Sequence, residues 1–363
     1  MKLAKWTVIP VCACFVLAVA CKKKKEENVE FDKGPIMVNL ADNYIIPGYE
    51  DLKTRILSLE SSWNDFLSDK TSAKLDVAKQ AWVDANISFQ HVKAFDFGPA
   101  MTANLVFTFG TFPCDTAQIN SNISTGGYDL TASTNLDATG FDALDYLLYS
   151  NGALTKFQNS ANACTYVSDV IAKMKTEITA VVSGWSSYRS TFVNGTSNES
   201  TSPFALLVNN FCKDFELCKT TKLGYPIGNH TLGIQQPNYL EARRSGISKT
   251  LLIENIRGSR AIFYGLSLSG ANGQGFDDYL NALEGKSSLS NTIATRFDYM
   301  LSTPQSWTGT LEELMSSSPA TLTNFYDYQQ ASVIHMKTDM ASAFGVLRSE
   351  ERRVGKECRS RWS

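Results

Sequence analysis

Apolar residues recur every three to four positions along most of the chain, which is the spacing of one face of an α-helix. The stretch 49–69 places Leu52, Ile56, Leu59 and Trp63 on such a face, and 73–95 repeats the pattern. The same spacing predicts helices over 164–192, 204–224, 238–265, 291–301 and 322–347. Strand-like alternation is scarce. We therefore predict an all-α protein.

Polar stretches divide these helices into two groups. Gly98 and Pro99 break the helical pattern, and the polar stretch 120–140 predicts a loop with one small element before a helix that begins at Gly140. Residues 194–203 are rich in Asn, Ser, Thr and Gly and predict a linker. We expect two helical-bundle halves packed side by side, 36–193 and 204–347.

The N-terminus has the pattern of an export signal. Lys2 and Lys5 precede an apolar run that is too short to span a membrane and ends on small residues before Cys21. This pattern resembles a bacterial lipoprotein signal over 1–20, with lipid attached to Cys21. A secretory signal cleaved nearby is the alternative. The charged residues 21–35 predict a flexible tether. Together with the signal, they lead us to expect an exported protein that is held on the outer membrane, on its periplasmic or cell-surface side.

The C-terminal residues 348–363 do not continue the helical pattern. They are rich in Arg and Lys and lack apolar periodicity. A basic, anion-binding tail is one interpretation. We prefer another, because the segment resembles translated sequencing-adapter sequence, and we expect the tail to be non-native.

Charge and cysteine content narrow the possible functions. A formal net charge of −2 and a pI near 6.0 give no electrostatic basis for binding nucleic acid. Outside the two ends, Cys114, Cys164, Cys212 and Cys218 allow two disulfides with three connectivities in an exported protein. Cys212 and Cys218 could pair only if their helix ended between them. The sequence contains no C-x-x-C spacing, which is the pattern that would favour a zinc site.

Acidic residues gather where the helical pattern breaks. Asp96 precedes the Gly98–Pro99 stop, and Asp115 follows a proline at an expected helix start. Asp142 and Asp145 lie one helical turn apart. Such a pair can bind a hard cation through oxygen, or act as a base if burial raises a pKa. It can equally be the acidic first turn of a helix, with Asp142 as its cap.

Five segments in order resemble imelysin-like proteins. They are LADNYIIPGYEDL, AWVDANISFQHVKAFDFGP, GFDALDYLLY, SGISKTLLIENIRG and MASAFGV, and the resemblance spans about 36–346. This family includes insulin-cleaving peptidases and iron-regulated exported proteins. The resemblance implies an all-helical fold of two bundle-like halves with a site in the cleft between them.

The family signature is altered in this chain. The family's G-x-H-x-x-E appears with Asp142 at the histidine position and Asp145 at the glutamate position. Its upstream W-x3-R-x2-Y-x3-E pattern appears as Trp82, Asn86, Phe89 and Lys93. Carboxylates favour harder cations than imidazole does, so these exchanges leave an oxygen-only site for a divalent or iron cation, or no metal site. We expect Lys93 to pair with Asp142 or Asp145 and to take the place of a cation.

These observations favour a non-enzymatic lipoprotein that binds a ligand in the cleft and serves iron or nutrient acquisition. An iron compound is the expected ligand, and an outer-membrane receptor or a redox protein the expected partner. A metallopeptidase is the first alternative, and it requires a metal-activated water. The second is a scaffold lipoprotein with a vestigial site.

Overall fold

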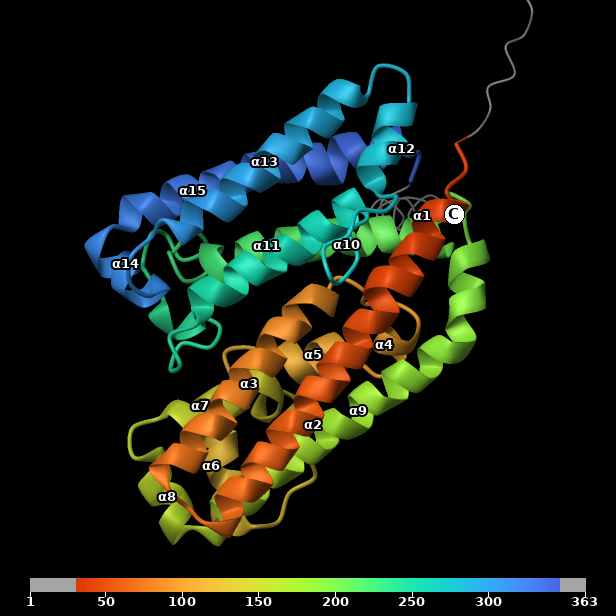
Figure 1. Ribbon diagram of the computed structural model, residues 1–363. Coiled ribbons are helices and arrows are strands. Elements are labelled where there is room, and N and C mark those ends of the chain that lie inside the picture. The colour runs from red at the N-terminus through yellow and green to blue at the C-terminus, as the bar shows by residue number, and fades with distance from the viewer. Residues whose placement is uncertain (1–30, 347–363) are drawn as a thin grey trace, which may run out of the picture. The chain divides into compact units, whose positions relative to one another are not determined.

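The computed structural model describes residues 31–346, and every regular element in that range is helical (Figure 1). The α-helices are α1 (Gly34–Leu40), α2 (Ile46–Ser68), α3 (Ser72–Val92), α4 (Pro99–Thr102), α5 (Leu105–Gly110), α6 (Thr116–Thr125), α7 (Gly140–Tyr149), α8 (Ala153–Asn159), α9 (Ala161–Asn194), α10 (Pro203–Lys219), α11 (Ser248–Tyr264), α12 (Phe276–Ala282), α13 (Ser287–Gln305), α14 (Leu311–Ser317), α15 (Pro319–Val333) and α16 (Ala341–Ala343). Three π-helical turns (Ala41–Ile45, Thr220–Gly224, Ile334–Met340) and two 3₁₀ turns (Ser133–Ala138, Pro237–Tyr239) complete them.

The N-terminal half is organised around three long helices. Helix α2 packs along α3 and α9, and α7 packs on α3, α5 and α9 (Figure 1). Trp63 and Phe66 of α2 meet Phe157 of α8 in a buried aromatic cluster, with ring centroids 5.0 to 5.8 Å apart. Side-chain caps set two of the helix starts, because Thr71 accepts from Lys74 N before α3 and Ser160 accepts from Ala163 N before α9.

The C-terminal half is built around α10, α11, α13 and α15, which pack against one another (Figure 1). Phe204, Phe276 and Phe344 bring α10, α12 and the end of the described chain into one buried cluster. Both halves therefore have apolar cores of their own.

Helices α3 and α11 join the two halves. Gly258 of α11 faces the backbone of α3, and a Cβ there would lie 3.2 Å from Gln90 O and 3.3 Å from His91 Cα. The glycine thus permits a closer approach of the two backbones than a larger residue would. His91 of α3 and Glu254 of α11 add a 2.9 Å contact at the same crossing.

The predicted all-α class with two bundle halves is confirmed, and three local predictions are wrong. Residues Asn120–Thr125, predicted as loop, complete helix α6. Residues 238–247, predicted as the start of a long helix, form the 3₁₀ turn, a short connection and further turns before α11 begins at Ser248. The predicted tether also ends early, since α1 begins at Gly34.

Predictions for the two ends fall mostly outside the described residues. These are the signal 1–20, the lipidated Cys21, the tether up to residue 30 and the tail 348–363. Within 31–346, no helix combines the length and the apolar character needed to span a membrane.

The four cysteines in the described part of the chain are buried, and Cys114, Cys164 and Cys218 are free thiols. Cys212 and Cys218 both lie on α10, which runs without interruption from Pro203 to Lys219. The condition for pairing these two residues is therefore not met.

Candidate functional site

Helix α7 presents the two aspartates of the altered signature to the loop that precedes α11. Asp142 accepts hydrogen bonds from Cys114 N at 2.8 Å and Ala242 N at 3.1 Å. Asp145 accepts from Arg244 N and Ser245 N, both at 2.9 Å. Each of the four carboxylate oxygens therefore accepts one backbone N–H, and we name this arrangement the aspartate clamp.

The clamp depends on an unusual backbone on both sides. In the loop, Ala242 has a φ of 51°, a left-handed conformation that L-residues seldom adopt. On α7, Gly140 has a φ of 77°, and a Cβ there would lie 2.4 Å from Thr108 O. Only glycine fits this start of α7. The glycine of the signature therefore has a structural cause that is independent of any ligand.

Burial governs the protonation of the clamp. Desolvation raises the pKa of Asp142 to about 6, and the neighbouring Asp145 adds to the rise, while the N–H groups of Cys114 and Ala242 oppose it. Burial likewise raises the pKa of Asp145 against the opposing hydrogen bonds from Ser245 and Arg244. Asp142 does not cap its own helix, because its carboxylate bonds to other segments.

A cation does not fit the clamp as it stands. Each oxygen already uses one of its two lone pairs for a backbone N–H, so a metal ion would find fewer coordination sites and would lie beside the positive ends of the N–H bonds. The space enclosed by Asn86, Phe141, Asp142, Glu241 and the residues around them leaves no room for a water molecule. Within residues 31–346, no group of three or more His, Cys, Asp or Glu side chains has the arrangement of a metal site.

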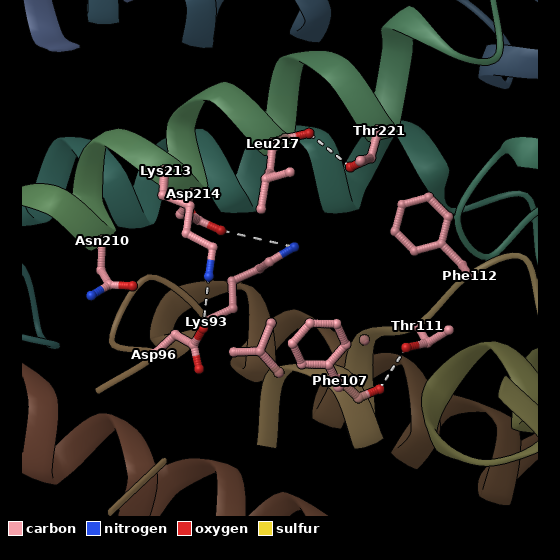
Figure 2. Close-up of a pocket in the computed structure, with 12 residues that line it drawn as sticks. Lys93, Asp96, Phe107, Thr111, Phe112, Asn210, Lys213, Asp214, Leu217 and Thr221 are labelled. Carbon is pink, nitrogen blue, oxygen red and sulfur yellow. Dashed lines mark hydrogen bonds and ion pairs between the residues drawn. The ribbon is translucent and has the colours of Figure 1, made fainter. Parts of the chain in front are cut away.

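An open cavity lies next to the clamp and shares Gly110, Thr111 and Phe112 with its surroundings. This cavity of about 240 Å³ lies between the α3–α5 segment and α10, and we call it the inter-half cavity (Figure 2). Its lining residues are Lys93, Asp96, Val106, Phe107, Gly110, Thr111, Phe112, Asn210, Lys213, Asp214, Leu217 and Thr221.

Lys93 is the residue for which the structure corrects the sequence prediction. Its Nζ lies 4.0 Å from Asp214 Oδ1 on α10 and forms no ion pair with Asp142 or Asp145 (Figure 2). The two aspartates need no lysine, because backbone N–H groups already occupy their oxygens. Asp214 is buried, which raises its pKa, and it also accepts a 2.6 Å hydrogen bond from Asn255.

The remaining candidates, Asp96 and Asp115, have separate roles. Asp96 lines the inter-half cavity and pairs with Lys213 at 2.9 Å (Figure 2). Both residues also line a wider neighbouring groove of about 690 Å³, so their ion pair borders both hollows. Asp115 caps α6 by accepting from Ala117 N and Gln118 N, as its place at a helix start predicted.

Sequence reasoning missed a buried charged cluster between the halves. Lys222, at the end of the α10 segment, pairs with Glu241 in the loop and donates to Gln90 of α3 at 2.9 Å. Burial favours neutral Glu241, but Lys222 and Lys93 outweigh it and hold the pKa of Glu241 below its usual range. The sequence signal that could have indicated this cluster was the position of Lys222 and Glu241, two charged residues close to breaks in the helical pattern.

The geometry defines an all-helical protein of two bundle halves, with a backbone-bonded acidic segment and an adjoining cavity where they meet. The imelysin family model, Peptidase_M75, matches residues 45–320. This chain belongs to the imelysin family.

Solved structures share this fold. An imelysin-like protein from Psychrobacter arcticum is 15% identical, with a TM-score of 0.71 over 86% of this chain and 96% of that one. A protein from Parabacteroides distasonis described as an iron-regulated protein A precursor is 16% identical, with a TM-score of 0.68 over 86% and 94%.

A curated relative, iron-regulated protein A of Synechococcus elongatus, is 25% identical over 109 residues. The match covers 30% of this chain and spans 30% of the length of that relative.

Proposed function

We propose that this chain is a non-enzymatic binding protein of the imelysin family that takes a small ligand into the inter-half cavity and serves iron or nutrient acquisition. One observation carries the proposal. The cavity is lined from both halves, and a buried lysine, Lys93, faces it while its nearest charged partner lies 4.0 Å away. Lining from two halves, with few polar groups among apolar ones, is typical of small-molecule sites.

The aspartate clamp supports binding over hydrolysis. A metallopeptidase needs a metal with an open position for water. Here the two signature carboxylates accept hydrogen bonds from three N–H groups of the loop and from that of Cys114. The two carboxylates therefore have a structural role, and the neighbouring inter-half cavity is the open space where the two halves meet.

The iron connection rests on the family. Relatives carry the description iron-regulated protein A, which is a statement about those proteins. Because the clamp does not suit a bare cation, an iron-related ligand would reach this chain as an iron compound. A receptor or a redox protein of the same membrane is the partner that such a role would require.

Export and lipid attachment at Cys21 form part of the same proposal, supported by the apolar run and the small residues before that cysteine. Cells that express the protein with Cys21→Ser should release it from the membrane fraction, and labelled fatty acid should enter only the unsubstituted chain. Unchanged membrane association of the variant would contradict the anchor.

A ligand screen by thermal shift tests the binding function. Nutrient mixtures, ferric chelates and haem are added to the purified protein, and a true ligand raises Tm because it stabilises by RT ln(1 + [L]/Kd). Leu217→Trp fills a wall shared by both hollows and should abolish the shift. Leu57→Trp is the matched control, because Leu57 is similarly exposed and lines neither hollow.

Two results would overturn the proposed function. The first is a screen in which no compound raises Tm, or in which every rise in Tm persists in Leu217→Trp. The second is metal-dependent cleavage of a protein substrate that Asp142→Asn and Asp145→Asn remove, because the clamp would then be catalytic.

A further inference from the structure

Lys93 is a charged group whose hydrogen-bonding capacity is unused. Its side chain is only 8% exposed, and among residues 31–346 the one carboxylate within 4.0 Å of its ammonium is that of Asp214. That distance exceeds hydrogen-bond range, while an ammonium has three N–H donors to place. The ammonium therefore has N–H donors available for an acceptor that enters the cavity from outside.

The other polar groups of the inter-half cavity are already engaged. Lys213 donates to Asp96, Asn210 donates through its amide to Leu206 O, and Asp214 accepts from Asn255. The hydroxyls of Thr111 and Thr221 donate to the carbonyls of Phe107 and Leu217 (Figure 2). Lys93 is thus the lining donor with no hydrogen bond of its own.

The remaining wall is apolar. Val106, Phe107, Phe112 and Leu217 line the cavity, and Phe107 and Leu217 are exposed at its edge. A volume of about 240 Å³ is of the size that takes a small molecule.

We propose that the inter-half cavity binds a small organic acid, with the carboxylate accepting hydrogen bonds from Lys93 and an apolar body lying against Phe107, Phe112 and Leu217. This inference rests on the proposed binding function and specifies its ligand class. The lining holds two lysines and two aspartates, so its formal charges cancel, and a monoanion is easier to accept there than a dianion such as phosphate.

Matched probes test the ligand class. Benzoate and hexanoate are titrated into the full protein by calorimetry, beside benzyl alcohol, hexanol and hexylamine, which keep the apolar body and change the head group. The carboxylates should bind saturably and the alcohols at least about tenfold more weakly, because they lose a hydrogen bond to a charged partner.

Lysine variants locate the contact. Lys93→Met should weaken benzoate binding by roughly tenfold or more. The double variant K93M/D214N should do the same, and it avoids leaving the buried Asp214 without its cation if the single variant folds poorly. Lys175→Met is the control outside the cavity, because Lys175 also pairs with a carboxylate, that of Glu60 at 2.8 Å, but lines neither hollow; it should keep the affinity within about twofold.

The outcomes separate this inference from the proposed function. Benzoate affinity that is unchanged in K93M/D214N, or alcohols that bind as tightly as carboxylates, would overturn the organic-acid assignment. So would the absence of saturable carboxylate binding. If the thermal-shift screen still yields a ligand that Leu217→Trp excludes, the binding function stands and only the ligand class is wrong.

Discussion

Asp145 and Asp115 each accept two backbone hydrogen bonds, but in different surroundings. Asp145 is fully buried and bonds a loop that lies 99 to 100 residues away in sequence. Asp115 is exposed and caps the helix that follows it. The two residues make a natural comparison, because the same side chain serves a long-range joint in one case and a local cap in the other.

Asp145→Ala should be the more costly substitution. It leaves the N–H groups of Arg244 and Ser245 without their acceptor, and each such loss costs about 1–3 kcal/mol when buried. Asp115→Ala should cost about 1 kcal/mol as the loss of a cap. Urea unfolding of both variants measures the difference, and equal losses would mean that the clamp contributes no more than a surface cap.

The raised pKa of Asp142 predicts a pH-dependent stability. Its pKa of about 6 in the folded protein lies above its ordinary 3.8, so the folded state holds the proton more tightly. The resulting contribution is fully present below about pH 3.8 and is lost as pH rises through about 6. The free energy of unfolding should therefore fall across this window by on the order of 3 kcal/mol through this residue.

Asp142→Asn should flatten that dependence when unfolding is measured at pH 4.5 and pH 7.5. Asp277 also has a pKa raised to about 6, chiefly by burial, and lies on α12 away from the clamp. Asp277→Asn is therefore the control that keeps the contribution of Asp142. If Asp142→Asn retains the full difference between the two pH values, the clamp does not titrate in this range.

At the scale of the element, the start of α7 is set by one glycine. Gly140 and Gly152 have the same φ of 77°, but a Cβ on Gly152 meets no atom within 4 Å. Gly152→Ala should therefore cost about 1 kcal/mol of backbone strain alone. Gly140→Ala adds the contact with Thr108 O and should cost at least about 2 kcal/mol more. Comparing the thermal unfolding of the two variants isolates the steric contribution. Equal losses of stability would show that the segment around Thr108 moves to accommodate the added Cβ at little cost.

The same elements show what the sequence could predict. Helices α2, α3 and α9 follow from apolar periodicity, because each buries one continuous face in its own half. The turns at 238–247 did not follow, since the apolar pattern runs through them. Their backbone is held by hydrogen bonds to Asp142 and Asp145, which a local pattern cannot reveal.

The candidate residues could be named from the sequence, but their contacts could not. Family spacing singled out Asp142, Asp145 and Lys93 from the sequence, and all three are buried where the halves meet. Their contacts depend on which helix faces which. Lys93 faces Asp214 because α10 packs beside the end of α3. Lys222 can be buried because the loop places Glu241 next to it.

At the scale of the whole molecule, the Lys222–Glu241 pair joins three parts of the chain. Lys222 follows α10, Glu241 lies in the loop, and Gln90 of α3 bonds to both. Glu241→Gln should cost about 3–5 kcal/mol, because it leaves the Lys222 ammonium buried without a counter-charge. The double variant K222M/E241L should recover much of this loss, since it removes both charges.

Chemical unfolding followed by tryptophan fluorescence and by circular dichroism checks that expectation. A double variant as unstable as Glu241→Gln would show that the cluster acts by packing and not by charge. Coincident transitions from the two probes would further show that the halves unfold together, as the joint formed by α3, α11 and the clamp requires.

The sequence separation of the clamp has a consequence for synthesis. Ala242, Arg244 and Ser245 leave the ribosome 99 to 100 residues after the aspartates that bind them. At about 5–20 residues per second, α7 waits roughly 5 to 20 s for its partner loop. During that interval the N-terminal half exposes two carboxylates and the face of α3 that later meets α11. The nascent chain is therefore most vulnerable to misassembly after its first half is complete, which makes this interval the stage at which a chaperone would be needed.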